Sequence, residues 1–377
     1  MMNFKEIISE AYCERLCDGL RGVEGVDGAL ALGVMEQVKR ELVELELKAR
    51  VQRVACALGE ILDDAFSGYE AQLDAVLSLR ELAGLGGGDT AESFELWPLT
   101  AWVSLRGLDE VALSLEGLKE LTTYFTGEFD IRPFLERHRE ETWRVLEGWV
   151  TDESKHVRRL VSEGTRAYLP WGIRVKWLVE NQDQVYDLIH ELKDDESDYV
   201  RRSVANNLND MTRLHGDWVV EKLAEWEEGE GEIKARRAWV KKHALRSLVK
   251  KGDVGALALL GFSDEVDVDV EGFTWSEDVS LDGDPLKLKV VLVSTSEEPQ
   301  DLVVDFVIHH VKANGGRSEK VFKWKVLELG AKETVTLSKK HAIKTITTRR
   351  YYEGEHKVEL KINGQVMGGG EFMLTTS

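Results

Sequence analysis

The sequence predicts a mainly α-helical protein: a HEAT-like α-solenoid over residues 1–255, followed by a C-terminal immunoglobulin-like β-sandwich over residues 262–377. Two observations predict this division, an internal repeat and a change in apolar period. Apolar residues recur every three or four positions in AQLDAVLSLRELAG (71–84) and WVVEKLAEW (218–226), which is typical of helices. After residue 262 they alternate instead. A chain of 377 residues also exceeds one ordinary core, so more than one folding unit is expected.

The repeat lies in the second half of the helical region. WVTDESKHVRRLV (149–161) superimposes on ELKDDESDYVRRSV (191–204) with a shift of 43 residues, and AWVKKHAL (238–245) is a weaker third copy. The identical pairs are Asp152/Asp195, Glu153/Glu196, Ser154/Ser197, Val157/Val200, Arg158/Arg201 and Arg159/Arg202. Lys241 and Lys242 stand in the two arginine positions of the third copy. A period of about 40–47 residues with two helices in each unit is typical of HEAT or armadillo repeats.

The first two copies predict helices whose N-caps are Ser154 and Ser197 and whose valine is turned toward the core. The two basic residues then recur at the same place on successive stacked helices. Because stacked repeats form a concave surface, we expect these pairs to form a basic stripe along it. Such a stripe suits a phosphate backbone.

The C-terminal region predicts about seven short strands. They are expected at 266–273, 286–294, 302–311, 320–329, 333–338, 357–362 and 370–375. Turn signals NGG (314–316) and NG (363–364) separate some of them. This number of short strands favours an immunoglobulin or fibronectin-type sandwich, here without a cysteine to form an inter-sheet disulfide. The segment KKHAIKTITTRRYY (339–352) predicts a basic and aromatic loop.

The charge is distributed unevenly along the chain, whose net charge is -20. Residues 1–154 hold 15 basic and 31 acidic side chains, residues 155–251 hold 19 and 17, and residues 252–377 hold 15 and 21. Within the middle segment, 155–176 carries six basic residues and one acid, and 234–251 carries eight basic residues and no acid. Phosphates respond to the local field rather than to the sum, so an acidic protein with two concentrated basic faces can bind DNA. Solvated helix faces remain the plainer interpretation of either run alone.

Other features exclude several classes of protein. No apolar stretch approaches the length of a membrane span, and the N-terminus lacks the apolar core of a signal peptide. Cys13, Cys17 and Cys56 form no CxxC pair, so we expect no metal and a reducing bacterial cytoplasm. No GxGxxG, P-loop, HExxH, nucleophile elbow or zinc-deaminase pattern is present, so we expect no cofactor. We expect a monomer.

The candidate chemical residues are acids and aromatics set among the basic stretches. Glu163 is the single acid of 155–176, Asp210 ends the polar run NNLND, and Glu128 follows Gly127 at the start of a new segment. Trp171 lies between Pro170 and Gly172, at a rigid turn between basic helices. Such a tryptophan can lie against a sugar or base. Helix caps for the acids and a core position for Trp171 are the alternatives.

Three segments carry a family resemblance: SEGTRAYLPWGIR (162–174), SDYVRRSVANNLND (197–210) and EFDIRPFL (128–135). Together they resemble the DNA alkylation repair glycosylases of the HEAT-repeat superfamily, specifically the AlkC type, over roughly residues 1–255. Some members of that type carry an appended immunoglobulin-like domain, which agrees with the strands after residue 262. The resemblance implies monofunctional excision of 3-methyladenine and related cationic bases from double-stranded DNA, without flipping the base into a pocket.

The resemblance also implies roles for individual residues. Glu128, Glu163, Asp210 and Trp171 match the residues that line the site facing the lesion, and Arg159 and Arg166 match arginines that contact DNA. With the stripe and the 339–352 loop, the expected DNA contacts are Arg158, Arg159, Arg166, Arg174, Arg201, Arg202, Lys241, Lys242, Arg349 and Arg350.

This chemistry is physically coherent. Alkylation of a purine ring nitrogen leaves a positive charge, so the glycosidic bond is already weakened and the leaving base needs little acid catalysis. Carboxylates near C1′ stabilise the oxocarbenium-like transition state and can orient a water. We expect Asp210 in that role, with Glu128 and Glu163 assisting and Trp171 stacking on the deoxyribose or facing the cation.

Two other functions fit parts of the sequence. HEAT solenoids are mostly interaction proteins, so a non-catalytic scaffold that binds nucleic acid or an acidic partner through the same stripe is the main alternative. A protein-binding module that uses the β domain as receptor is another, and it predicts no affinity for DNA. A pure phosphate binder gives no reason to place Glu163 among six bases, and this favours the enzyme.

Overall fold

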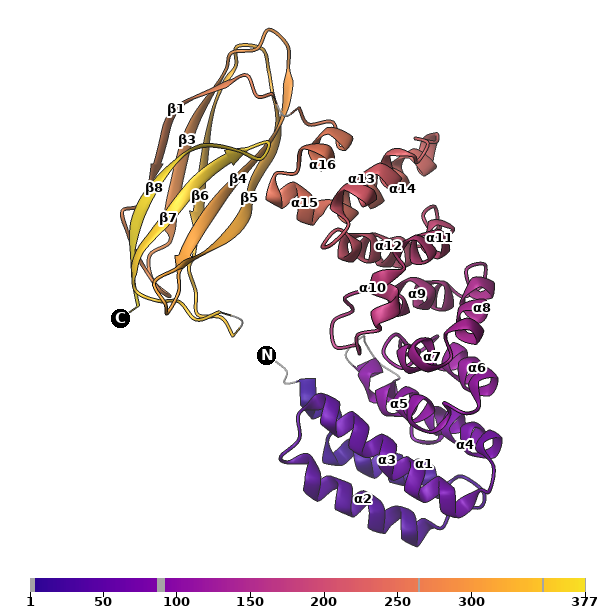
Figure 1. Cartoon of the computed structure of the whole chain (residues 1–377). Coiled ribbons are helices and arrows are strands. Elements are labelled where there is room, and N and C mark those ends of the chain that lie inside the picture. Colours follow the sequence, from indigo (N-terminus) through magenta and orange to yellow (C-terminus); the bar gives the residue numbers. More distant parts are fainter. Residues whose placement is uncertain (1–3, 87–91, 264, 348, 377) are drawn as a thin grey trace. The chain divides into compact units, whose positions relative to one another are not determined.

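The computed structural model describes residues 4–86, 92–263, 265–347 and 349–376 (Figure 1). Helices fill the N-terminal two thirds, and the change to strands lies between Leu259 and Val268. The first helices are η1 (Phe4–Ile7), α1 (Glu10–Arg21), α2 (Gly28–Leu42), α3 (Leu47–Ala65), α4 (Tyr69–Leu82), η2 (Glu92–Leu96), α5 (Trp97–Arg106) and α6 (Val111–Leu121). The next are α7 (Arg132–Arg137), α8 (Arg139–Trp149), α9 (Lys155–Gly164), α10 (Lys176–Glu180), α11 (Gln182–His190) and α12 (Asp198–Met211). The last are α13 (Gly216–Ala224), α14 (Gly231–Ala244), α15 (Arg246–Lys251) and α16 (Val254–Leu259).

Packing divides the chain into two compact units. The first contains the helices up to Met211 together with Glu230–Val240, and the second contains Thr212–Gly229 together with the segment from Lys241 onward. The last helices therefore group with the strands. Within the described residues, no helix combines the length and the apolar character needed to cross a membrane.

The repeat shapes the first unit. Val157 and Val200 are buried, as the repeat predicts, and Ser154 caps α9 by accepting from the amide of His156. Before both helices an aspartate accepts from the serine amide: Asp152 from Ser154 and Asp195 from Ser197, each at 2.8 Å. Equivalent residues thus start α9 and α12 in the same way, and the two helices pack against each other.

The strands form the expected two-layered sandwich in the second unit. They are β1 (Val268–Trp275), β2 (Asp278–Ser280), β3 (Leu286–Ser294), β4 (Gln300–Val311), β5 (Arg317–Leu329), β6 (Thr334–His341), β7 (Gly354–Ile362) and β8 (Gln365–Thr375). One sheet has the order β1-β3-β6 and the other β2-β8-β7-β4-β5. The short β2, which pairs parallel to β8, was not predicted. Leu288, Val290, Phe306, Leu360 and their neighbours form the core between the sheets.

A tight backbone approach joins α15 and α16 to the sandwich. Gly252 and Gly364 both have positive φ, and a Cβ added to Gly252 would lie 2.7 Å from the Cα of Gly364. Asn363 secures the same place because its amide donates to the Ser263 carbonyl at 2.8 Å while its oxygen accepts from the Val303 amide at 2.7 Å. Only glycines permit this approach, because both backbone conformations and the spacing exclude a side chain.

Candidate active site

The first acid of the site lies in the short segment before α7. Glu128 is buried, and Thr126 donates its hydroxyl to Glu128 Oε2 at 2.9 Å. The amide of Gly127 donates to the Thr122 hydroxyl at 3.1 Å, which fixes the segment to the end of α6. The carboxylate is therefore held by its own turn and aimed away from solvent.

Helix α9 supplies the second acid and the first guanidinium. Arg159 and Glu163 are one turn apart, and Arg159 Nη2 lies 3.5 Å from Glu163 Oε1. Arg159 also donates to Glu128 Oε2 and, at 2.7 Å, to the Thr126 hydroxyl. One arginine thus joins two carboxylates from different segments.

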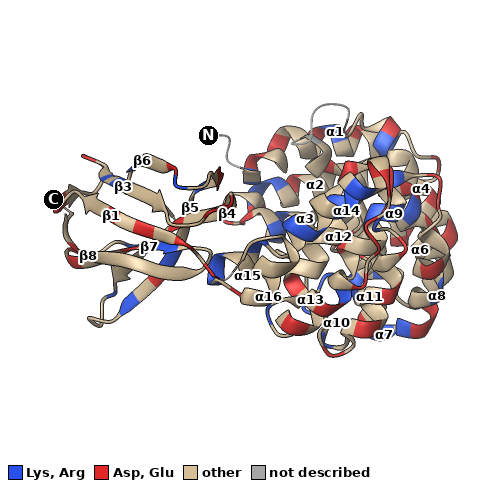
Figure 2. Cartoon of the chain, turned by 90° about the horizontal axis from the view of Figure 1, so that it is seen from above, with Lys and Arg blue, Asp and Glu red and all other residues tan. Residues whose placement is uncertain are grey.

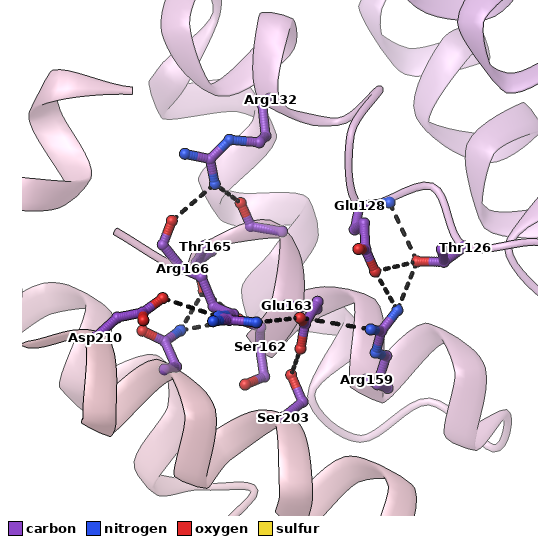
Figure 3. A network of polar contacts seen from close by, with 12 residues as sticks. Thr126, Glu128, Arg132, Arg159, Ser162, Glu163, Thr165, Arg166, Ser203 and Asp210 are labelled. Carbon is purple, nitrogen blue, oxygen red and sulfur yellow. Dashed lines mark hydrogen bonds and ion pairs between the residues drawn. The ribbon is translucent and has the colours of Figure 1, made fainter. Parts of the chain in front are cut away.

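Arg166 joins the second acid to the third (Figure 3). Its Nη1 donates to Glu163 Oε1 at 2.6 Å, and its Nε donates to Asp210 Oδ2 at 2.9 Å. Ser203 of α12 donates to the other oxygen of Glu163 at 2.6 Å. Carboxylates and guanidiniums therefore alternate in the order Glu128, Arg159, Glu163, Arg166, Asp210, and we call these five residues the carboxylate cluster. When all three acids are ionised, three negative and two positive groups give the cluster one net negative charge.

Burial and neighbouring charges shift the pKa values of Glu128 and Glu163 in opposite directions. Burial raises the pKa of Glu128 above its ordinary value, although Arg159 opposes this. Burial also acts to raise the pKa of Glu163, but Arg159 and Arg166 outweigh it and hold that pKa below its ordinary value. Glu163 is consequently the firmly ionised member of the pair.

Arg132 fixes the loop that follows α9. This fully buried arginine donates to the carbonyls of Gly164 and Arg166, both at 2.8 Å, and to that of Ile173 at 2.6 Å. Both ends of the loop are thereby held by one side chain. This role of Arg132 was not predicted, because nothing in the sequence around Pro133 shows that an arginine there turns inward.

Trp171, within this loop, has an unusual backbone. It is a non-glycine residue with φ of 67°, a conformation that costs free energy and is retained where the surroundings enforce it. Its side chain is 52% exposed, and its ring stacks on the buried ring of Trp97. Lys48 donates to its carbonyl at 2.7 Å. The chain holds this aromatic face outward at an energetic cost, which is typical of a functional residue.

The predicted basic pairs separate into two structural classes. Arg158 binds Asp195 through two hydrogen bonds of 2.6 and 3.0 Å, and Arg201 donates to the Asp195 carbonyl and to Asp198. The first arginine of each pair therefore folds back onto the turns between repeats, and its contact with DNA stays a prediction. Arg202 is exposed, whereas its counterpart Arg159 enters the carboxylate cluster.

The remaining expected DNA contacts are scattered over both units. Arg174 is exposed and lies over the ring of Tyr168, while Lys242 is exposed on α14, where basic residues gather as on α9 (Figure 2). Lys241 donates to the Trp226 carbonyl at 3.3 Å. Arg349 and Arg350 lie beside Tyr351 and Tyr352 in the predicted loop, of which residue 348 is outside the described residues. The first three residues of that predicted loop belong to β6.

A basic face on the three-stranded sheet was not predicted from the sequence. Lys287 lies directly opposite Lys340, and Lys289 opposite Ser338, with Thr274 beyond Lys289 on β1. These residues line a groove of about 500 Å³. Like charges directly opposite each other are unfavourable unless an anion joins them. The alternation in LKLKV (286–290) is the signal, because it turns both lysines to the outer face.

Comparison with known proteins places the chain in a family. A family model for the C-terminal Ig-like domain of the uncharacterised protein YhaZ matches residues 269–376. The uncharacterised protein YhaZ of Bacillus subtilis (strain 168) is 33% identical over 335 residues, which are 88% of this chain and 88% of that protein. The solved structure of Pseudomonas fluorescens alkylpurine DNA glycosylase AlkC, bound to DNA containing an abasic site analog, is 33% identical and covers 100% of both chains with a TM-score of 0.90.

The chain belongs to the AlkC family of DNA glycosylases. The family resemblance stated from three sequence segments is thereby confirmed, as is the order of a helical region and an immunoglobulin-like domain. Within this AlkC-type fold, the carboxylate cluster and Trp171 form the candidate active site.

Proposed function

We propose that this protein excises cationic alkylpurines, such as 3-methyladenine, from double-stranded DNA by hydrolysing the N-glycosidic bond, and that it does so without flipping the base. The observation that carries the proposal is the carboxylate cluster: three buried acids that share two guanidiniums. The AlkC relative is an alkylpurine DNA glycosylase, which supports the same substrate class.

The net negative charge of the cluster suits the reaction. When the bond to an alkylated purine breaks, positive charge moves from the base to the deoxyribose, and fixed carboxylates in a water-poor site stabilise it more in the transition state than in the ground state. Asp210 is our choice for the carboxylate nearest C1′, where it also orients the attacking water. Glu163, held ionised by Arg159 and Arg166, supports the same field.

Trp171 and the exposed basic residues supply the remaining parts. The outward face of Trp171 can stack on the deoxyribose or meet the cationic base. Arg202 and Arg174 would contact phosphates, and a bent duplex would expose the lesion without extrusion. A neutral, undamaged base offers the carboxylates no charge to stabilise, so selectivity for cationic lesions follows from the same electrostatics.

Base release from DNA containing 3-methyladenine tests the proposal. We expect wild type to release the base and Asp210→Asn to lower the single-turnover rate by about 10²–10³-fold, as for the loss of one preorganised electrostatic group. Asp195→Asn is a matched control because the Asp195 side chain is as little exposed as that of Asp210, 5% against 4%, and is paired with an arginine outside the cluster. Both variants should lose stability, but only Asp210→Asn should lose base release.

Two results would contradict the proposal. Normal release by Asp210→Asn removes the catalytic assignment. DNA binding by wild type with no base release favours the non-catalytic scaffold instead.

A further inference from the structure

We propose that Tyr199 is a positioning residue whose ring holds Arg159 in place between Glu128 and Glu163. The role rests on the proposed function, since it concerns the same carboxylate cluster. Tyr199 is not one of the site residues described above, which are three acids, two arginines and Trp171.

The contacts of Arg159 leave one side to the tyrosine ring. Its guanidinium binds Glu128 and Thr126 closely, but the nearest oxygen of Glu163 is 3.5 Å away. The guanidinium carbon also lies 5.0 Å from the centre of the Tyr199 ring. A ring face at that distance attracts the cation and limits its motion. The aromatic ring is therefore a further partner for a guanidinium whose ionic contact with Glu163 is long.

The repeat explains why an aromatic residue stands there. Tyr199, near the start of α12, occupies the position of His156 in the preceding copy, 43 residues earlier. The two rings meet edge to face, with centroids 5.7 Å apart. Burial, Lys155 and Arg159 lower the pKa of His156, so the imidazole is neutral near pH 7 and adds no charge beside Arg159. Equivalent positions of two repeats thus place two neutral rings in contact, and the Tyr199 ring lies against Arg159.

The contact between Tyr199 and Arg159 affects the pKa of Glu128. Burial raises the pKa of Glu128, and Arg159 is the main group that opposes the rise. The charged or titratable groups around Glu128 are Arg159 and Glu163 of α9, Tyr199 of α12, Asp130 of its own segment and Arg132 of α7. If the guanidinium of Arg159 moves more freely, it lowers the pKa of Glu128 less, and Glu128 stays protonated to a higher pH. A residue that only filled space would not move this titration.

The experiment compares Tyr199→Phe and Tyr199→Leu with a matched control. Tyr124 is also about half exposed, at 45% against 42% for Tyr199, and it also carries an arginine, Arg80, over its ring at 3.6 Å. Single-turnover base release is measured from pH 5 to 9, and the titration of Glu128 is followed by carboxyl ¹³C NMR without DNA. Thermal melting confirms that each variant is folded.

We expect Tyr199→Phe to behave as wild type, because a phenyl ring keeps the cation contact. Tyr199→Leu should release base about tenfold more slowly, move the acid limb of the pH profile upward and raise the Glu128 titration. Tyr124→Leu should leave the rate and both titrations unchanged.

The two proposals can fail separately. An unchanged Glu128 titration in a folded Tyr199→Leu variant overturns the positioning role, as does a loss in Tyr199→Phe equal to that in Tyr199→Leu. Absence of base release by wild type overturns the proposed function, while the NMR titration still decides the role of Tyr199.

Discussion

Trp171 stacks on Trp97 in a nearly parallel, offset arrangement, with ring centroids 6.1 Å apart and planes that differ by 9°. Trp97 is 4% exposed and begins α5, so the inner ring is anchored in the helical core. Trp171 is 52% exposed and carries the positive φ. The stack on Trp97 holds the second ring toward solvent, while the backbone of the loop is strained at Trp171. Arg132, which binds both ends of the loop, and Gly172, which lies beside Arg132, allow the loop to keep this conformation.

Gly172 gives the first prediction. A Cβ at this position would lie 2.9 Å from Leu169 Cδ2 and 3.1 Å from Arg132 Cδ. Gly172→Ala should therefore shift Arg132, lower stability by about 1–3 kcal/mol and reduce base release. Thermal unfolding and single-turnover kinetics measure the two effects.

Gly148 provides its control. An added Cβ there meets nothing within 4 Å, and the residue lies in the last turn of α8. Gly148→Ala should raise stability by roughly 0.5–1 kcal/mol through helix propensity and leave base release unchanged. Equal behaviour of the two variants would show that the loop tolerates a side chain beside Arg132.

Asp130 gives a pH-dependent prediction. This buried acid accepts from the Ser104 hydroxyl at 3.0 Å, and burial raises its pKa to about 7. The pKa of Asp130 is therefore higher in the folded protein than in the unfolded chain, where it has its ordinary value of 3.8. Between these two pH values the folded protein keeps a proton that the unfolded chain has lost. The stabilising effect is complete below pH 3.8 and is lost as the pH rises through 7, a total of about 4 kcal/mol.

Asp130→Asn removes this titration while keeping an oxygen for Ser104. We expect the variant to gain stability relative to wild type between pH 5 and pH 8, because other ionisable groups contribute equally to both proteins. Denaturant unfolding at the two pH values measures the difference. A constant difference would show that Asp130 is ionised throughout in the folded state.

The two classes of repeat arginine should differ in solution. Arg158→Ala leaves the partly buried Asp195 carboxylate without its cation, so stability should fall by about 1–3 kcal/mol. Arg202→Ala should leave stability nearly unchanged, weaken DNA binding and flatten its salt dependence by roughly one phosphate contact. Fluorescence anisotropy over a salt series, together with thermal melting, separates the two classes. The assignment is wrong if Arg158→Ala alone changes the salt slope.

The lysine face of the β domain offers a further test of DNA contact. The double variant Lys287→Ser, Lys340→Ser removes the opposed pair on β3 and β6. If the face binds phosphates, the salt slope should fall by roughly two contacts. The control changes Lys357 and Lys361 to serine, since these lysines are paired with Glu359 and Glu319. An equal change in the salt slope of both double variants would show that the lysines act only through the total charge and do not form a phosphate-binding face.

Much of the fold could be predicted from the sequence because it depends on local periodicity. The 43-residue repeat placed Val157 and Val200 in the core, and the change to alternation marked the β-sandwich. The strand β2 could not be predicted, because three residues paired to β8 carry too short a pattern. Glu163 stood out in the sequence as the single acid among six basic residues, whereas Asp210 was chosen from its place at the end of NNLND and from the family resemblance.

Tertiary packing alone decided how those residues meet. Arg166 joins its near neighbour Glu163 to Asp210, which lies 44 residues further along the chain. Arg132 fixes the Trp171 loop through the carbonyl of Gly164, which is 32 residues away, and no local pattern connects either pair of segments. The sequence likewise made Arg158 and Arg159 look alike, but adjacent helical residues point in different directions: one ties two repeats together and the other enters the carboxylate cluster. The sequence determined which residue types were present, while the stacking of the helices determined which of them form ion pairs with one another.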